Sequence, residues 1–287
     1  MLTPTTPAGE PNLVACEQLV DLFARQNLGG IYLVGSTGGW PLFTIAERKR
    51  ITGTVVKAAA GRIPVMVHVG AVATADAVEL AQHAAAVGAD AVSAVGPIYY
   101  KHPPEVTFEF YRRIGAATPL PLFAYHLSGV NQSALGPREF AARLLEIPTV
   151  VGMKITDHDL YPFGLIHGLA GDRLRLFSGA DEVMCHAVLS GACGAIGTFY
   201  NVFGPACAAA RTATVAGDVA AGRAFMLRFQ ATIADAIAGG MWSFLRAAVR
   251  LKYGIDVGMP RPPLGAADGE WAEDRVRELV TRVDGAG

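Results

Sequence analysis

Short apolar segments alternate with longer amphipathic segments along most of the chain. Seven of the apolar segments have the length and the continuous apolar character of parallel strands that are buried on both faces. These predicted strands are residues 30–35, 64–69, 89–95, 121–125, 149–154, 174–178 and 194–198. Leu2-Thr3-Pro4 is a candidate for the stub of an eighth strand that precedes them.

The segments between these strands are predicted to be helices. Thr44 and Glu47 fit a capping box, in which a hydroxyl and a carboxylate satisfy backbone donors at a helix start. Gly136-Pro137 places a proline at the first position of another helix. A strand followed by a helix, repeated about every 30 residues, is the βαβ pattern. The predicted fold is therefore α/β, a (β/α)8 TIM barrel, with an open doubly wound sheet as the alternative.

The pattern changes after residue 198. Three apolar-faced segments follow with no strand between them, and a loop rich in Gly and Pro separates them from a final polar segment. The predicted helices are residues 203–216, 219–237, 241–253 and 269–283. This change predicts a barrel over residues 1–200 and a C-terminal helical extension, residues 201–287, that packs on the barrel.

The composition narrows the class of protein. Hydrophobic residues make up 52% of the chain and charged residues 17%, which permits a large core and excludes disorder. The formal net charge is −1, so no basic surplus indicates binding to nucleic acid or to an anionic membrane. We expect a cytoplasmic protein with reduced thiols, because no export signal is visible and its cysteines lack zinc-site spacing. These cysteines are Cys16, Cys185, Cys193 and Cys207.

Lys154 is the leading candidate for a nucleophile. It ends the apolar segment TVVGMK, which contains no acidic residue. Burial favours the neutral amine, the form that attacks a ketone, and arginine has no such form near pH 7. The C-terminal end of a barrel strand is where Schiff-base enzymes carry their lysine. A lysine in a structural ion pair, or one whose charged end reaches the solvent, is the alternative.

Tyr125 stands at the matching end of the preceding predicted strand. A phenol at this place would relay protons to a Schiff-base intermediate, although a packing role is the alternative. His126 is a second candidate for an acid or base, with a structural histidine that bonds a backbone carbonyl as its alternative.

The loop after the first predicted strand is Gly35-Ser36-Thr37-Gly38-Gly39. Successive backbone N–H groups and the hydroxyls of Ser36 and Thr37 favour an anion. The loop lacks the lysine of a P-loop and the spacing of a dinucleotide fingerprint, so a carboxylate is the expected ligand. A tight strand-to-helix turn without a ligand is the alternative.

Together these segments resemble the dihydrodipicolinate synthase/N-acetylneuraminate lyase superfamily of class I aldolases. The segments that carry the resemblance are GSTG at 35–38, GAD at 88–90, PIYY at 97–100, Tyr125, GMKIT at 152–156 and GACGAIGTFYN at 191–201. The resemblance implies that Lys154 forms the Schiff base and that Tyr125 relays the proton. It also implies that Ser36 and Thr37 bind the carboxylate of pyruvate, and that no cofactor or metal ion takes part.

Within the superfamily, the chain resembles the branch of the sialic-acid lyases. Gly179-Ala180-Asp181-Glu182 is similar to the lyase segment whose acids hold sugar hydroxyls, and Thr156 and Thr198 fit the same branch. Capping of the following helix is the alternative role for Asp181 and Glu182. Tyr100 resembles the tyrosine that these enzymes lend to a neighbouring subunit, which implies a homotetramer.

Among the departures of the chain from the family pattern, two concern position 39 and the loop after Tyr125. Gly39 stands where family members usually carry glutamate, and the loop after Tyr125 is about three residues shorter than usual. The expected function is cleavage or formation of a C–C bond between pyruvate and an aldehyde, as in N-acetylneuraminate lyase. Dehydration of a 2-keto-3-deoxy sugar acid and a dihydrodipicolinate synthase-like condensation are alternatives through the same imine. A barrel that binds a keto acid without turnover is the non-enzymatic alternative.

Overall fold

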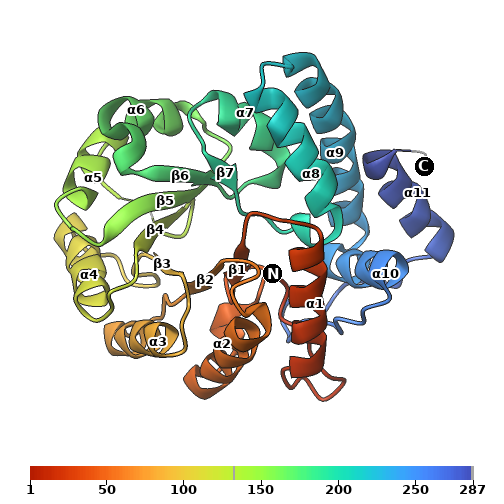
Figure 1. Ribbon diagram of the computed structural model, residues 1–287, viewed down its shortest axis with the longest axis horizontal. Coiled ribbons are helices and arrows are strands. Elements are labelled where there is room, and N and C mark those ends of the chain that lie inside the picture. Colours follow the sequence, from red (N-terminus) through yellow and green to blue (C-terminus); the bar gives the residue numbers. More distant parts are fainter. Residues whose placement is uncertain (132, 286–287) are drawn as a thin grey trace. The chain divides into compact units, whose positions relative to one another are not determined.

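The computed structural model describes residues 1–131 and 133–285, and its contacts separate the chain into two compact units (Figure 1). The first unit is discontinuous and combines Met1–Pro64 with Thr198–Gly287. The second unit is the continuous segment Val65–Gly197. The chain therefore leaves the first unit after Pro64 and returns to it at Thr198.

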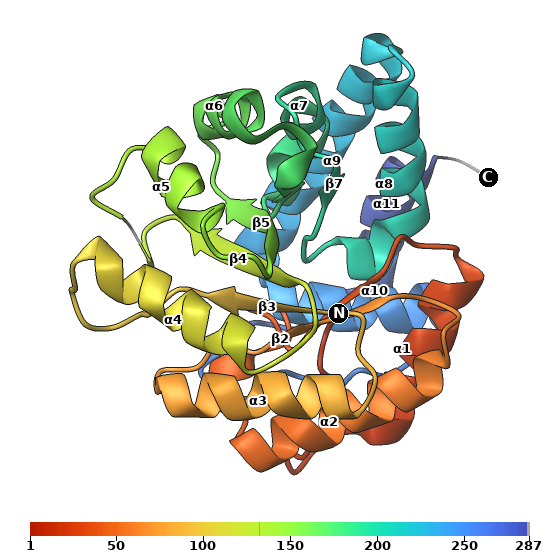
Figure 2. The same cartoon turned by 60° about the vertical axis from the view of Figure 1, so that its left-hand side comes forward.

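In the second unit, the described residues form a parallel sheet of six strands, in the order in which they occur in the chain. The strands are β2 Val65–His68, β3 Ala91–Val95, β4 Leu122–Leu127, β5 Val150–Thr156, β6 Arg175–Ser178 and β7 Gly194–Ala195. The connecting helices are α3 Thr74–Ala86, α4 Pro104–Ala116, α5 Pro137–Leu144, α6 Tyr161–Ala170 and α7 Met184–Leu189, with the short 3-10 helices η2 Gly171–Arg173 and η3 Asp181–Val183. Figure 2 shows α3 and α4 side by side, with α5 beside α6. This succession of strand and helix confirms the α/β class.

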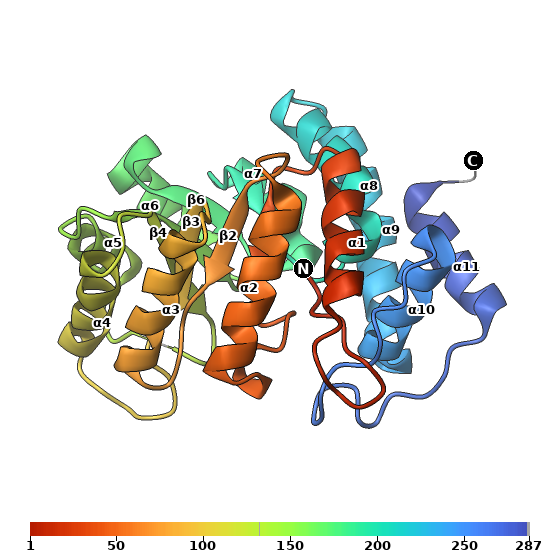
Figure 3. The same cartoon turned by 60° about the horizontal axis from the view of Figure 1, so that its bottom comes forward.

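The first unit contains one strand and most of the longer helices. Its elements are α1 Leu13–Arg25, β1 Ile31–Leu33, η1 Trp40–Leu42, α2 Ile45–Ala59, α8 Tyr200–Val215, α9 Val219–Gly239, α10 Met241–Tyr253 and α11 Glu273–Asp284. Figure 3 shows α1 and α2 packed side by side. The helices predicted after residue 198 are thus present, although the first begins at Tyr200 and the last only at Glu273.

The start of α2 shows how the sequence sets a helix boundary. The Thr44 hydroxyl accepts a hydrogen bond from the backbone N–H of Glu47, and the Glu47 carboxylate accepts one from the backbone N–H of Thr44. This pair is the predicted capping box, and it is confirmed. The helix then buries Ile51 and Val55, which lie one turn apart on the same face.

The seven predicted strands are all present, but their ends differ from the prediction. β4 and β5 continue for two residues beyond Tyr125 and Lys154, because His126 pairs with Ile155 and Leu127 pairs with Thr156. The last predicted strand, residues 194–198, is reduced to the two residues of β7. Neither Tyr125 nor Lys154 is therefore the final residue of its strand.

The N-terminal segment does not form the strand that was predicted there. The N-terminal ammonium group donates a hydrogen bond of 2.8 Å to the carbonyl of Tyr32, and the N–H of Leu2 donates one of 2.9 Å to Asn201 Oδ1. Thr5 makes an isolated antiparallel bridge with Pro11. The residues that the structure describes therefore contain seven strands and not eight.

Candidate active site

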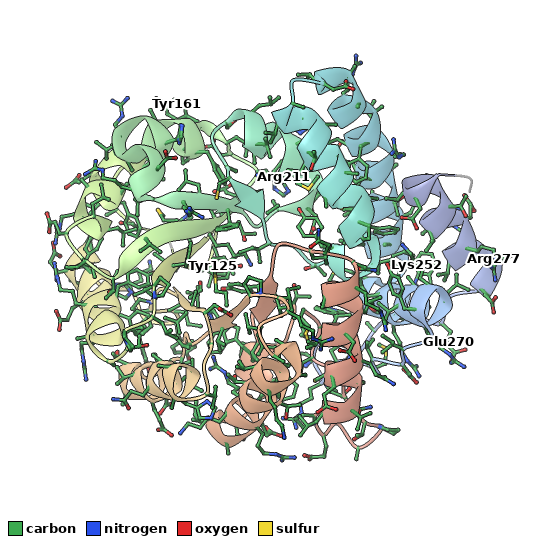
Figure 4. The ribbon with its side chains drawn as sticks, viewed as in Figure 1. Tyr125, Tyr161, Arg211, Lys252, Glu270 and Arg277 are labelled. Atoms are coloured by element: carbon green, nitrogen blue, oxygen red, sulfur yellow. The ribbon has the colours of Figure 1, made fainter. Side chains whose placement is uncertain are left out.

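Lys154 and Tyr125 are neighbours on adjacent strands of the second unit. Tyr125 of β4 pairs in register with Lys154 of β5, which pairs with Phe177 of β6, so the three side chains project from one face of the sheet. The Nζ atom of Lys154 lies 4.2 Å from the centroid of the Tyr125 ring, above its face. Lys154 is only 6% exposed and Tyr125 2%. In Figure 4 Tyr125 lies on the side of the strands that is turned away from α4 and α5.

Thr156 joins this pair from the last position of β5. Its Oγ1 atom donates a hydrogen bond of 3.2 Å to the phenolic oxygen of Tyr125. A hydroxyl at this distance stabilises negative charge on the phenol oxygen and fixes the direction of the phenol's own O–H. The structure thus brings together three residues that the sequence singled out, Lys154, Tyr125 and Thr156.

Gly179 makes room for this group at the end of β6. A β-carbon built on Gly179 would overlap Thr156 Oγ1 and would lie 2.8 Å from Cε of Lys154. The backbone N–H of Gly179 donates a 2.8 Å hydrogen bond to the carbonyl of Ile155. The predicted site residue Gly179 is therefore required by the close approach of its backbone to the lysine and the threonine.

His68 is a neighbour of Tyr125 that the sequence analysis did not identify. It is buried in β2, and its ring meets the Tyr125 ring edge-on, with centroids 6.2 Å apart. Its Nε2 atom accepts a hydrogen bond of 3.1 Å from the N–H of Val95, which assigns the proton of a neutral ring to Nδ1. A polar residue inside the apolar segment PVMVHV was the available signal for this position.

His126, the second candidate for an acid or base, lies on the face of β4 opposite to Tyr125, because adjacent strand residues alternate. Burial lowers the pKa of His126, and the nearby Asp157 carboxylate opposes this shift. Burial acts to raise the pKa of Asp157, but hydrogen bonds from the backbone of Asp159, the Ser128 side chain and the backbone of His158 outweigh it and lower that pKa. The structure separates His126 from the Lys154 group.

The acids of the GADE segment lie in η3, directly after β6. Asp181 is 5% exposed, and its carboxylate packs so closely on Gly197 that a β-carbon there would overlap it. Glu182 is half-buried, and its Oε2 atom lies 3.8 Å from Nε2 of the exposed His158, which follows the end of β5. The sequence did not point to His158. This residue follows Asp157 and lies beside Glu182, a predicted sugar-binding acid.

Tyr100 is not part of the Lys154 group in this chain. It lies in the loop after β3 and is 74% exposed. Its ring packs edge-on against Tyr99, with ring centroids 4.9 Å apart. An exposed pair of aromatic rings on a connecting loop fits a surface that meets another molecule.

The predicted carboxylate loop belongs to the first unit. Ser36 is exposed and Thr37 is half-buried, in the turn between β1 and η1. The Oγ1 atoms of Thr37 and Thr198 lie 2.7 Å apart in a hydrogen bond, which brings together two predicted site residues that are distant in sequence. Thr3 Oγ1 donates a 2.8 Å hydrogen bond to the carbonyl of Gly38 and holds the loop from its other side.

Gly39, where the family usually has glutamate, adopts a left-handed conformation with φ of 65°. A residue with a β-carbon is strained in this conformation, whereas glycine is not. Gly39 lines a hollow in the first unit together with Arg261, and Arg261 forms an ion pair with Glu47. A hydrogen bond from Arg261 lowers the pKa of Glu47 to about 2. Arg261 is therefore paired with the carboxylate of Glu47, and this ion pair does not need a glutamate at position 39.

Within residues 1–131 and 133–285, no three His, Cys, Asp or Glu side chains are grouped so as to hold a metal ion. In the same described part of the chain, no helix has the length and apolar character needed to cross a membrane.

The residue pattern of the Dihydrodipicolinate synthetase family matches residues 1–282. The chain belongs to this family. It is 32% identical over 288 residues to an N-acetylneuraminate lyase of Mus musculus, with 97% of this chain and 90% of that protein covered. It is 33% identical over 219 residues to an N-acetylneuraminate lyase of Rhizobium meliloti, with 76% of this chain and 72% of that protein covered.

Solved structures of this family share the fold. The sialic acid aldolase of Ruminococcus gnavus matches with a TM-score of 0.91 at 25% identity, covering 99% of this chain and 94% of that one. The N-acetylneuraminate lyase of Mycoplasma synoviae matches with a TM-score of 0.87 at 28% identity, with the same coverage. The family resemblance inferred from the sequence motifs is confirmed, and the fold is of the TIM-barrel type that this family uses.

Proposed function

We propose that this chain is a class I lyase that cleaves a 2-keto sugar acid of the N-acetylneuraminate type into pyruvate and an aldehyde. The single observation that carries the proposal is the group formed by Lys154, Tyr125 and Thr156. It places a buried primary amine above a phenol that is itself hydrogen-bonded to a hydroxyl. Membership of the family and the curated relatives, which are named N-acetylneuraminate lyase, support this choice of substrate.

The proposed reaction begins at the ketone carbon of the sugar acid. The neutral amine of Lys154 adds to this carbon, water leaves, and a protonated imine forms. The imine accepts the electron pair of the C3–C4 bond as that bond breaks, while the C4 hydroxyl gives its proton to the Tyr125 oxygen and becomes the aldehyde. As it accepts this proton, the Tyr125 hydroxyl delivers its own proton to C3 of the resulting enamine, and addition of water to the imine then releases pyruvate and restores the amine.

The other predicted residues have roles in binding. Ser36 and Thr37, with Thr198 beside Thr37, would bind the carboxylate of the keto acid. Asp181, Glu182 and Thr156 would accept or donate hydrogen bonds to the hydroxyls of the sugar chain, and Gly179 would leave space for them.

The proposed assembly follows from the same resemblance. Tyr100 would reach the site of a neighbouring subunit in a homotetramer, and its high exposure in the single chain supports this. We place the enzyme in the cytoplasm. We further propose that residues 1–200 form a barrel of the (β/α)8 type, to which the described residues contribute seven strands, with residues 201–287 as a helical extension.

Trapping of the imine tests the proposal. The protein is incubated with pyruvate, reduced with sodium borohydride and digested, and the peptide that contains Lys154 is analysed by mass spectrometry. We expect a stable pyruvate adduct on Lys154, and none in Lys154→Arg, which keeps the charge but has no neutral amine. An unmodified Lys154 peptide in the wild-type protein would remove the imine mechanism.

Dehydration of a 2-keto-3-deoxy sugar acid is the second candidate, and the short loop after Tyr125 favours it because this loop would shape the access of the acceptor aldehyde. Incubation with N-acetylneuraminate and with 2-keto-3-deoxygluconate separates the two reactions. Cleavage releases pyruvate, whereas dehydration leaves the carbon chain intact. Intact dehydrated product without free pyruvate would assign the second reaction.

A further inference from the structure

The backbone on either side of the Tyr125 side chain is held by the carboxamide of Asn131. Asn131 Nδ2 donates a hydrogen bond of 2.8 Å to the carbonyl oxygen of Tyr125. Asn131 Oδ1 accepts one of 2.7 Å from the backbone N–H of Leu127. One planar amide therefore binds a carbonyl and an N–H two residues apart, near the C-terminal end of β4. The catalytic phenol is attached to the backbone that this amide clamps.

Two further groups hold the same backbone. The N–H of Gly96 donates a longer hydrogen bond of 3.4 Å to the carbonyl of Tyr125. The buried Tyr111 hydroxyl is hydrogen-bonded to the Tyr125 backbone, and burial raises the pKa of Tyr111, which keeps this phenol neutral. Tyr125 is thus anchored by one side-chain amide, one backbone amide and one phenol, all within the second unit.

Gly96 leaves the space that the Asn131 carboxamide occupies, and we call this carboxamide with its two hydrogen bonds to β4 the clamp. A β-carbon built on Gly96 would lie 2.9 Å from Asn131 Nδ2 and 3.3 Å from the Tyr111 hydroxyl oxygen. The carboxamide therefore fits against bare backbone, and a larger residue at position 96 would push it away from the Tyr125 carbonyl. Glycine at this position and asparagine at 131 together make the clamp.

The clamp belongs to the loop that is shorter than the family pattern. The N–H groups of Val130 and Asn131 both donate to the carbonyl of Leu127, at 3.0 and 3.2 Å, so the chain turns back immediately after β4. This tight turn brings the Asn131 side chain onto the strand end. A longer loop would not return the chain to β4 at this residue.

We propose that Asn131 is a positioning residue that acts through Tyr125. It fixes the strand end so that the phenol oxygen stays within reach of Thr156 Oγ1 and of the substrate that Lys154 binds. Asn131 would not touch the substrate itself. This inference rests on the proposed function, because it assumes that the Tyr125 phenol transfers the proton in the reaction. A small displacement of a catalytic group lowers the rate by a large factor, because proton transfer requires the donor and acceptor atoms to lie within hydrogen-bond distance.

A double-mutant cycle tests the inference. Asn131→Asp keeps an oxygen that accepts from the Leu127 N–H but loses the donor to the Tyr125 carbonyl, and Asn131→Ala loses both. Each is made in the wild-type protein and in Tyr125→Phe. The rate of turnover is measured with N-acetylneuraminate and with 2-keto-3-deoxygluconate, and pyruvate trapping is measured in parallel. Ser133→Ala is the matched control, because the Ser133 hydroxyl accepts a hydrogen bond from the Leu135 N–H in the same loop.

We expect Asn131→Asp to lower kcat by about 10- to 100-fold, the scale of a misplaced catalytic group, while KM and pyruvate trapping change less than about threefold. In Tyr125→Phe, which has no phenol to misplace, the same change should lower kcat less than about twofold. Ser133→Ala should behave as the wild type. If Asn131→Asp unfolds at the assay temperature, the Asn131→Ala arm of the cycle gives the same comparison.

The outcomes separate this inference from the proposed function. An equal loss of kcat in both backgrounds would show that Asn131 only stabilises the loop, and would overturn the inference while leaving the enzyme assignment intact. A wild-type protein that forms no borohydride adduct, or turns over neither acid, would overturn the proposed function and the inference with it.

Discussion

The Nζ atom of Lys154 lies above the face of the Tyr125 ring, 4.2 Å from its centroid, and the phenol oxygen at the far end of that ring accepts a hydrogen bond from Thr156. The ring and the hydroxyl of Tyr125 thus have separate neighbours. An ammonium group over an aromatic face is attracted by the ring, and this attraction is present in phenylalanine as well as in tyrosine. Substitutions can therefore separate the contribution of the ring from that of the hydroxyl.

Tyr125→Phe should keep pyruvate trapping at Lys154 and lose cleavage. The ring remains below the lysine, so imine formation persists, whereas the proton transfer is lost and turnover falls by roughly 10²- to 10⁴-fold. Tyr125→Leu removes the ring as well and should lower both. Borohydride trapping and pyruvate release are measured on the same samples. Complete loss of trapping in Tyr125→Phe, as in Lys154→Arg, would show that the phenol is needed to form the imine.

Thr156→Val should reduce turnover without removing the lysine chemistry. Valine has nearly the shape of threonine but cannot donate to the Tyr125 oxygen, and one lost hydrogen bond to a group that develops charge corresponds to a rate loss of about 10- to 100-fold. Trapping of pyruvate should remain close to the wild-type level. Thr156→Ser, which restores the hydroxyl, should recover most of the rate, and failure of this rescue would contradict the role assigned to Thr156.

Gly179→Ala should destabilise the folded protein or displace the Lys154 side chain from its place in the site. The added methyl group overlaps Thr156 Oγ1 and approaches Lys154 Cε, so strand ends or side chains must move, at a cost of about 1–3 kcal/mol. We expect a lower melting temperature and loss of trapping at Lys154. Gly168→Ala in α6 is the control, since a β-carbon there meets nothing within 4 Å. Normal trapping in Gly179→Ala would show that the close approach has no functional effect.

Glu182→Gln and His158→Ala should alter recognition of the sugar chain and not the imine. Glu182 lies 3.8 Å from the His158 ring, outside the group formed by Lys154, Tyr125 and Thr156. Loss of the carboxylate should raise KM for the sugar acid by about tenfold, the scale of one charge-assisted hydrogen bond. His158→Ala removes a competing partner of Glu182 and should lower KM or leave it unchanged. Steady-state kinetics with pyruvate trapping as the reference test both variants.

The ion pair of Glu47 with Arg261 should stabilise the folded protein above acid pH. The pKa of Glu47 is about 2 in the folded protein, against an ordinary value of 4.5, so the carboxylate favours the folded state above pH 4.5. This contribution, about 3 kcal/mol at most, should disappear as the pH falls from 4.5 to 2. Glu47→Gln should be less stable at neutral pH and should lose that part of the acid dependence. Denaturant unfolding at pH 7, 4.5 and 3 measures it.

The sequence predicted the fold class and the central pair of the site because both depend on local patterns. Continuous apolar segments followed by amphipathic ones define βαβ units, and a lysine inside such a segment stands out whatever surrounds it. Motif order then identified the family. Strand ends were less predictable, since pairing of His126 with Ile155 depends on the neighbouring strand and not on either residue alone.

His68, Asn131 and His158 could not be recognised as neighbours of the predicted residues from sequence alone. Each is polar and belongs to a different loop or strand, and its importance arises only when it meets a partner distant along the chain. Asn131 meets Tyr125 through a tight turn whose geometry no single residue encodes. The absence of an eighth strand from the described residues has the same cause, because Met1 bonds the Tyr32 carbonyl of β1 through its terminal ammonium group and Leu2 bonds the side chain of Asn201.

The discontinuous first unit has a consequence for synthesis on the ribosome. Its N-terminal part is translated first, but that part bonds to Asn201 through Leu2 and to Val257 through Thr5, residues that are translated after the second unit. The continuous unit, Val65–Gly197, is translated before either of these partners. The N-terminal segment therefore cannot make these two hydrogen bonds until the continuous unit has been translated. A truncation before α10 would remove Val257 and with it the hydrogen bond from Thr5, which makes such truncations targets for chaperones and proteases.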